Sequence, residues 1–319
     1  MSKTLAMAQK ELTILLRDKG LIAALLLPMI FVIALGLIPM FFESQLDMLQ
    51  LPTSMGSALT DDDLNTTRYN VGDDGAITIY CDRTNYASII EAMLERDKLI
   101  EQLSGLQIDV VDSSSGDTID VSLSALNLAA PILLMLLICD SAAYMVVDMF
   151  TGERERKTLG ILILCAGART TFFGKALVLC LLGLTESFFL TLSTSAYAYS
   201  SMLSAEYLPL VFLLLAALSL ATMGTQALLA IILKSVRSAQ LATSLVPALP
   251  VIASIAYAVT NASAIEQLPY IGLGATLVDV FSGADIRMEW LPALVSSMVM
   301  VVILAMLSLA ALKRSCRDV

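Results

Sequence analysis

The sequence contains no histidine, and its five cysteines are scattered along 319 residues. Proteins hold zinc and haem mainly through histidine and cysteine side chains that are brought together. The chain therefore lacks the usual ligands for either group. It also lacks a recognisable nucleophile motif and paired metal ligands. The composition does not favour an enzyme, and we expect no metal or other cofactor in this chain.

Charged residues are also scarce, at 15% of the chain, while hydrophobic residues reach 57%. Soluble domains carry about a quarter charged residues, so this composition is typical of a membrane protein. Six apolar runs approach the roughly 20 residues that a helix needs to cross a bilayer. They cover residues 20–42, 123–147, 176–197, 208–233, 238–259 and 290–312. We predict an all-α polytopic membrane protein with six transmembrane helices.

The basic residues predict the orientation of these helices. If the N-terminus is cytoplasmic, 14 of the 19 lysines and arginines fall in inside segments, as the positive-inside rule requires. We therefore expect a multi-pass protein of a prokaryotic plasma membrane with both termini, including the tail 313–319, in the cytoplasm. Residues 43–121 hold 16 acidic and four basic residues, whereas the whole chain has a net charge of −10. The acidity thus belongs to an external segment, and nothing indicates a nucleic-acid partner.

Two soluble segments have patterns of their own. Residues 1–19 form an amphipathic pattern, with charged Lys3, Lys10 and Glu11 set apart from the apolar positions. This pattern predicts a helix lying flat in the cytoplasmic interface, and a simple extension of the first span is the alternative. In 43–121, strand patterns in "AITIY" and "IDVVD" flank a helical pattern, which predicts a small α/β extracytoplasmic domain with a parallel strand pair.

Three smaller features leave alternatives open. The Asp-rich turns of the external domain could present oxygen ligands to calcium, although none has the EF-hand spacing; solvated turns are the default. Pro247 and Pro250 predict a kink in the fifth span. The Gly-punctuated segment 261–289 is either a re-entrant hairpin or an external loop folded on the helices.

The stretch "GERERKTLGILILCAGARTTFFGK", which begins at Gly152, lies between the second and third spans on the cytoplasmic side. Basic residues here could simply anchor the chain to anionic headgroups. That explanation leaves out Glu153 and Glu155, because an anionic leaflet repels carboxylates. Alternating signs instead favour a protein partner that offers both charges.

With its N-terminal helix, Pro28, external domain and this stretch, the chain resembles the permease subunit of an ABC transporter of the second exporter type (ABC-2). In that family a similar loop is a coupling helix that docks into a cytoplasmic ATPase subunit. The chain departs from the family pattern at Gly160 and at "CAGA". Within the coupling loop 150–175, the resemblance assigns ATPase coupling to Glu153, Arg154, Glu155, Arg156, Lys157, Thr158, Leu159, Gly174 and Lys175.

The resemblance also implies partners. A phosphate-binding loop needs Gly, four residues and then Gly-Lys-Ser/Thr, whereas "GARTTFFGKA" has six residues in the gap and ends in alanine. ATP and magnesium are therefore expected on a separate cytoplasmic ABC ATPase. Six spans are half the usual complement, so a second permease chain, identical or related, should complete the transporter within the lipid bilayer.

Carboxylates within spans often mark a transport pathway. Asp140 and Glu186 lie in spans and Asp148 lies near a cytoplasmic end, although packing within the bundle would explain them as well. The external domain makes the chain similar to the sodium-efflux (NatB-like) branch, which predicts sodium export. Export of a lipid, peptide or drug remains open, as does a membrane sensor or scaffold whose acidic outer domain binds a ligand.

Overall fold

The computed structural model describes residues 3–17, 29–34, 69–71, 77–81, 92, 96, 99, 108–112, 121–140, 143–199, 203–260, 265, 268–282 and 290–315. Within this part of the chain the structure is mostly helical, and five helices are long and apolar enough to cross a membrane. They are Ala129–Glu155, Ala168–Ser195, Ala205–Ile232, Val236–Ala258 and Trp290–Arg314. Most of the predicted first span, 20–42, lies outside the described residues, although 29–34 are helical.

From α5 to α11 the helical elements follow one another with short connections. In chain order, the helical elements are α1 (Lys3–Arg17), α4 (Val121–Asp140), α5 (Ala143–Val147), a π-helical turn (Asp148–Gly152), α6 (Glu153–Glu155), α7 (Thr158–Ala166), α8 (Ala168–Tyr199), a 3-10 turn (Ala205–Tyr207), α9 (Leu208–Ile232), α10 (Val236–Ser244), α11 (Ala248–Thr260), α13 (Ile271–Ser282) and α14 (Trp290–Ser315). The predicted boundaries hold well for α9 and for the start of α14. At three other places, a local feature of the chain makes the observed boundaries differ from the predicted ones.

The third span begins at Ala168 and not at residue 176. Gly167 has a φ of 84°, which only glycine adopts readily, and it separates α7 from α8.

The fifth span is divided into α10 and α11, as the prolines predicted. Between them the backbone makes i to i−3 hydrogen bonds such as Val246 N–H to Thr243 O at 3.2 Å, because Pro247 has no N–H to continue the α-helical ladder. The second span extends beyond its predicted end at residue 147, because the π-helical turn continues the helical run to Glu155.

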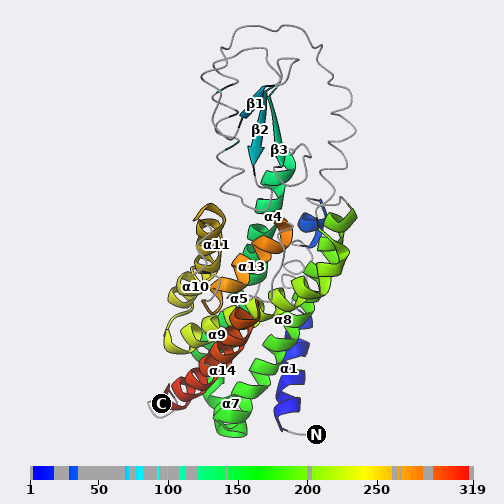
Figure 1. Ribbon diagram of the computed structural model, residues 1–319. Coiled ribbons are helices and arrows are strands. Elements are labelled where there is room, and N and C mark those ends of the chain that lie inside the picture. Colours follow the sequence, from blue (N-terminus) through cyan, green and yellow to red (C-terminus); the bar gives the residue numbers. More distant parts are fainter. Residues whose placement is uncertain are drawn as a thin grey trace.

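The bundle has two distinct ends (Figure 1). Both termini and α7 lie at one end, and the strands lie at the other. One cluster of buried side chains includes residues of α4, α9, α11 and α13, and a second cluster gathers α1, α5, α8 and α9 around Phe150. The helix α13 packs against α4, α9, α11 and α14 and is almost entirely buried. This packing is compatible with both alternatives for 261–289, the re-entrant hairpin and the external loop folded on the helices.

A small sheet has the strand order β1-β2-β3. Strand β2 (Ile77–Cys81) pairs in parallel with β3 (Ile108–Asp112), which confirms the predicted parallel pair. Strand β1 (Tyr69–Val71) was not predicted and adds to β2 in the antiparallel direction. Most of the helix predicted between β2 and β3, and most of both Asp-rich turns, lie outside the described residues.

Candidate functional site

The charged stretch after the second span forms two short helices and a tight turn. Helix α6 is a single turn that ends at Glu155, and Lys157, two residues later, has a φ of 62° in the left-handed region. The Lys157 N–H donates to Arg154 O at 2.9 Å, and the Arg156 N–H donates to Gly152 O at 3.0 Å. These bonds close α6, as a left-handed residue after a helix commonly does. The chain then turns into α7 at the end of the bundle.

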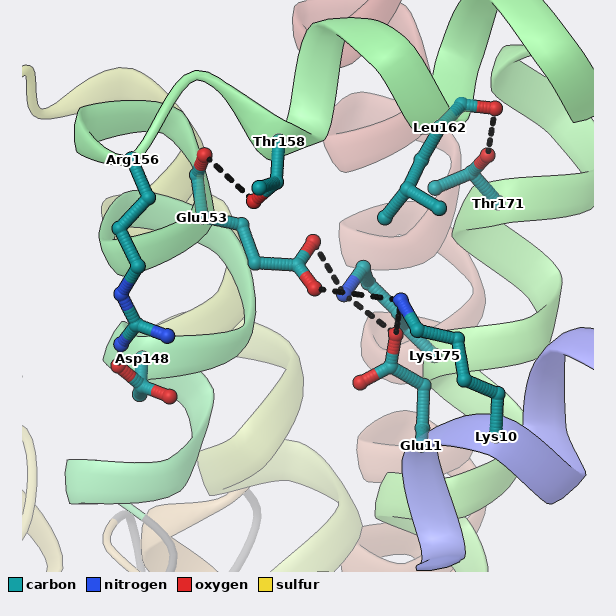
Figure 2. A network of polar contacts seen from close by, with 9 residues as sticks. All are labelled: Lys10, Glu11, Asp148, Glu153, Arg156, Thr158, Leu162, Thr171 and Lys175. Atoms are coloured by element: carbon teal, nitrogen blue, oxygen red, sulfur yellow. Dashed lines mark hydrogen bonds and ion pairs between the residues drawn. The ribbon is translucent and has the colours of Figure 1, made fainter. Parts of the chain in front are cut away.

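A buried ion cluster joins three elements behind this turn (Figure 2). The Nζ atom of Lys175, on α8, lies 3.0 Å from Glu11 Oε1 of α1 and 2.8 Å from Glu153 Oε2 of α6. Lys10 Nζ lies more loosely beside the same carboxylates, at 3.7 Å from Glu11 and 4.0 Å from Glu153. The Lys175 side chain has no exposed surface, and its ammonium also lies 5.8 Å from the centre of the Phe150 ring.

This cluster corrects the predicted environment of Glu11 on the N-terminal helix. Glu11 was expected on its solvated face, but it is only 3% exposed and points at Lys175. Helix α1 runs beside the first half of α8 (Figure 1), and Gly174 lies at their contact. A Cβ atom at Gly174 would lie 2.7 Å from Met7 Cγ. The physical reason for the correction is that Lys175, buried on α8, requires a counter-charge, and α1 supplies one.

Two neighbours in the sequence, Arg154 and Glu155, bind opposite helix ends. Arg154 donates through Nη2 to Ile231 O at 2.7 Å and through Nη1 to Leu233 O at 3.3 Å, at the C-terminal end of α9. Glu155 Oε1 accepts from the Val236 N–H at 2.7 Å, at the start of α10. A helix C-terminus carries partial negative charge and an N-terminus partial positive charge. The alternating signs of this pair therefore match the two helix ends that meet at the α9–α10 connection.

Arg156 of the charged stretch forms an ion pair on the surface with Asp148, which lies four residues before the stretch begins. Gly152 lies between them, and a Cβ atom there would lie 2.6 Å from Asp148 Oδ1. The absence of a side chain at Gly152 thus gives the pair room to form. Thr158 Oγ1 adds a bond to Glu153 O at 3.1 Å, which ties the start of α7 back to α6.

Sequence reasoning interpreted the alternating charges as a surface for a partner protein, and the structure shows that these charges also make contacts within the chain. Glu153, Arg154, Glu155 and Arg156 all contact groups of their own chain. The exposed surface of this segment combines the polar residues Glu155, Arg156 and Lys157 with apolar side chains on α7. Leu164 is 87% exposed and Ile161 is 61% exposed on α7, whereas Leu159 is buried against the bundle. The charges hold α7 in place, and α7 presents aliphatic side chains.

The three carboxylates predicted on a transport path are not brought together. Asp140 is exposed at the end of α4, and the Asp148 side chain is 43% exposed and paired with Arg156. Glu186, in contrast, is buried on α8, at 4% exposure. No group of three or more acidic, cysteine or histidine side chains that could hold a metal ion occurs within the described residues. Of the three, only Glu186 has its side chain in the bundle interior.

The structure also shows two polar contacts inside the bundle that sequence reasoning missed. Gln226 Nε2 donates to Cys139 O at 2.9 Å, joining α9 to α4. Tyr257 OH donates to the Asp279 carboxylate at 3.0 Å, joining α11 to α13. Gln226 and Asp279 each stand within an apolar run, and that isolation was a signal that could have identified them. A polar group in a membrane span requires an internal partner.

The comparisons with known proteins do not assign the chain to a group. No family model matches it, no curated protein matches it, and no solved structure matches it. The described part of the chain is mostly helical, holds five candidate membrane spans, and contains a charged segment that is bonded to the bundle next to the exposed apolar helix α7.

Proposed function

We propose that the chain is the permease subunit of an ATP-driven ABC exporter of the ABC-2 type, with α7 as the surface that contacts a separate cytoplasmic ATPase. One observation carries the proposal. Helix α7 lies between two candidate spans, is bonded to the bundle through α6, and exposes Leu164 and Ile161 at the end where both termini lie. A short helix held rigidly from behind and apolar in front suits a mechanical contact with another protein.

The contacts behind α7 supply a route for force. A displacement of α7 would act on α6, whose Glu153 is joined through Lys175 to α8 and through the same lysine to α1. Arg154 and Glu155 would carry the displacement to the α9–α10 connection. Several helices would therefore respond to one push, as the opening and closing of a transport path requires.

For the cargo we propose sodium, with Glu186 as the residue that meets the ion inside the bundle. The support is its burial at the middle of α8 in a region of small and hydroxyl side chains that includes Ser187. Intramembrane carboxylates are costly, and where they occur they commonly serve ion pathways. Asp140 and Asp148 receive no role in this path, because both side chains lie at the surface.

The test is the ATPase rate of the permease reconstituted in vesicles with its partner ATPase, with and without sodium. We expect sodium to stimulate turnover, and Glu186→Gln to remove the stimulation while leaving the basal rate. Thr185→Val, at the preceding position of α8, is the matched control and should keep the response, because the Thr185 side chain is exposed and faces away from the bundle interior. Stimulation by a lipid, peptide or drug without a sodium response would overturn the sodium proposal. Failure of the chain to alter any ATPase rate would overturn the exporter proposal itself.

A further inference from the structure

A second surface, distinct from α7, lies between α9 and α14 at the end of the bundle where both helices finish. It is a cavity of about 510 Å³ lined by Arg154, Leu228, Ile231, Ile232, Lys234, Leu307, Ala310, Ala311 and Arg314. The residues of α14 recur at intervals of three and four, so they occupy one helical face. The residues of α9 follow the same spacing. The cavity is thus a groove between two adjacent helices.

The groove has a cationic end and an apolar end. Lys234 follows the end of α9, Arg314 is in the last turn of α14, and Arg154 is held against the final carbonyls of α9. The apolar end includes Leu307, which lies about 10 Å further along α14 than Arg314, because a helix rises about 1.5 Å per residue. Ala310 and Ala311, between them, leave room with their small side chains.

The charge in the groove has one sign. Three of its lining residues are cationic and none is acidic, among the residues that the structure describes. This differs from the ion cluster around Lys175, where two carboxylates accompany two ammonium groups. It also differs from an ordinary basic border of a membrane span, because the three cations converge from α6, from the α9–α10 connection and from α14 on a single concavity. Cations that converge on one concavity attract an anion.

We propose that this groove binds an anionic phospholipid, with the headgroup phosphate between Lys234, Arg314 and Arg154 and an acyl chain along Leu307 and Leu228. Arg and Lys are the residues that bind phosphate in proteins, and basic pockets between membrane helices suit anionic headgroups. The neighbouring surface is apolar and accessible to an acyl chain, since the side chains of Ile232 and Leu307 are at least half exposed. Through Arg154 the lipid also contacts the segment that holds α7.

The proposal can be tested by native mass spectrometry of the full chain in detergent, titrated with phosphatidylglycerol or with phosphatidylcholine. We expect one phosphatidylglycerol to bind more tightly than phosphatidylcholine. Lys234→Gln and Arg314→Gln should each weaken that binding about fivefold, the effect of one basic residue near an anionic surface. Lys313→Gln is the matched control, because Lys313 is adjacent on α14 but does not line the groove.

Three results would overturn the proposal. One is an equal loss of binding in Lys313→Gln and Arg314→Gln, which would indicate a diffuse basic surface. Another is displacement of phosphatidylglycerol by excess inorganic phosphate, which would indicate a site for free phosphate and not for a lipid. The last is unchanged binding in Ala310→Leu, a variant that keeps all three cations but narrows the groove where the acyl chain would lie.

Discussion

Replacing Lys175 with methionine tests whether the buried ion cluster holds α1, α6 and α8 together. The Lys175 side chain has no exposed surface, and it contacts two carboxylates at 2.8 Å and 3.0 Å whose side chains are only 12% and 4% exposed. Breaking a buried ion pair by removing one partner costs about 3–5 kcal/mol, since the remaining charge has no compensation. Lys10 stays beside both carboxylates, so we expect a loss near the lower limit, about 3 kcal/mol.

The assay is equilibrium unfolding in mixed micelles followed by circular dichroism. Lys10→Met is the control, because the Lys10 side chain is 45% exposed and a surface pair contributes at most about 1 kcal/mol. The triple variant Lys175→Met with Glu11→Gln and Glu153→Gln removes every buried charge of this cluster. Its free energy of unfolding should return to within about 2 kcal/mol of that of the original chain. If Lys175→Met costs no more than Lys10→Met, the cluster does not hold the three helices together and the reasoning is refuted.

Three further substitutions make predictions in the same unfolding assay. Gly174→Ala should destabilise by about 1–3 kcal/mol, because its Cβ would lie 2.7 Å from Met7 Cγ; a neutral result would mean that α1 does not pack there. Gly160→Ala should instead stabilise by about 0.5–1 kcal/mol, since nothing lies within 4 Å of its Cβ position in α7, and a loss would contradict an open surface. Glu155→Gln should cost about 0.3–1 kcal/mol, with a smaller difference at high salt, because it removes a charge at the start of α10.

Sequence patterns predicted the elements that depend on local chemistry. Uninterrupted apolar runs marked α9 and α14 because a membrane span must be apolar along its length. Pro247 marked the break between α10 and α11 because a missing N–H acts locally. Gly167 also carried a local signal, as a glycine that follows an apolar helical run commonly ends a helix. The prediction placed the start of the third span after Gly174 instead, and a separate helix ahead of it was expected only from the family resemblance.

The candidate site could not be predicted in the same way because its contacts join distant positions. Glu11 and Lys175 lie 164 residues apart, and no local pattern shows that α1 packs beside α8. The roles of Arg154 and Glu155 likewise depend on the ends of α9 and α10, which approach α6 only in the folded chain. The sequence alone marked the charged stretch that begins at Gly152 as unusual. The reason for its alternating charges became clear only from the tertiary contacts.

The exporter proposal is tested most directly by a photo-crosslinking amino acid placed at Leu164, the most exposed large hydrophobic side chain of α7. The same reporter at Val302 on α14, which is 60% exposed and expected to face lipid, is the control. After irradiation of intact cells, we predict that Leu164 captures a chain with the Gly-x4-Gly-Lys-Ser/Thr phosphate-binding loop and that Val302 does not. Capture of lipid alone at Leu164, or of the same proteins at both positions, would contradict the assignment of α7 as the contact with an ATPase.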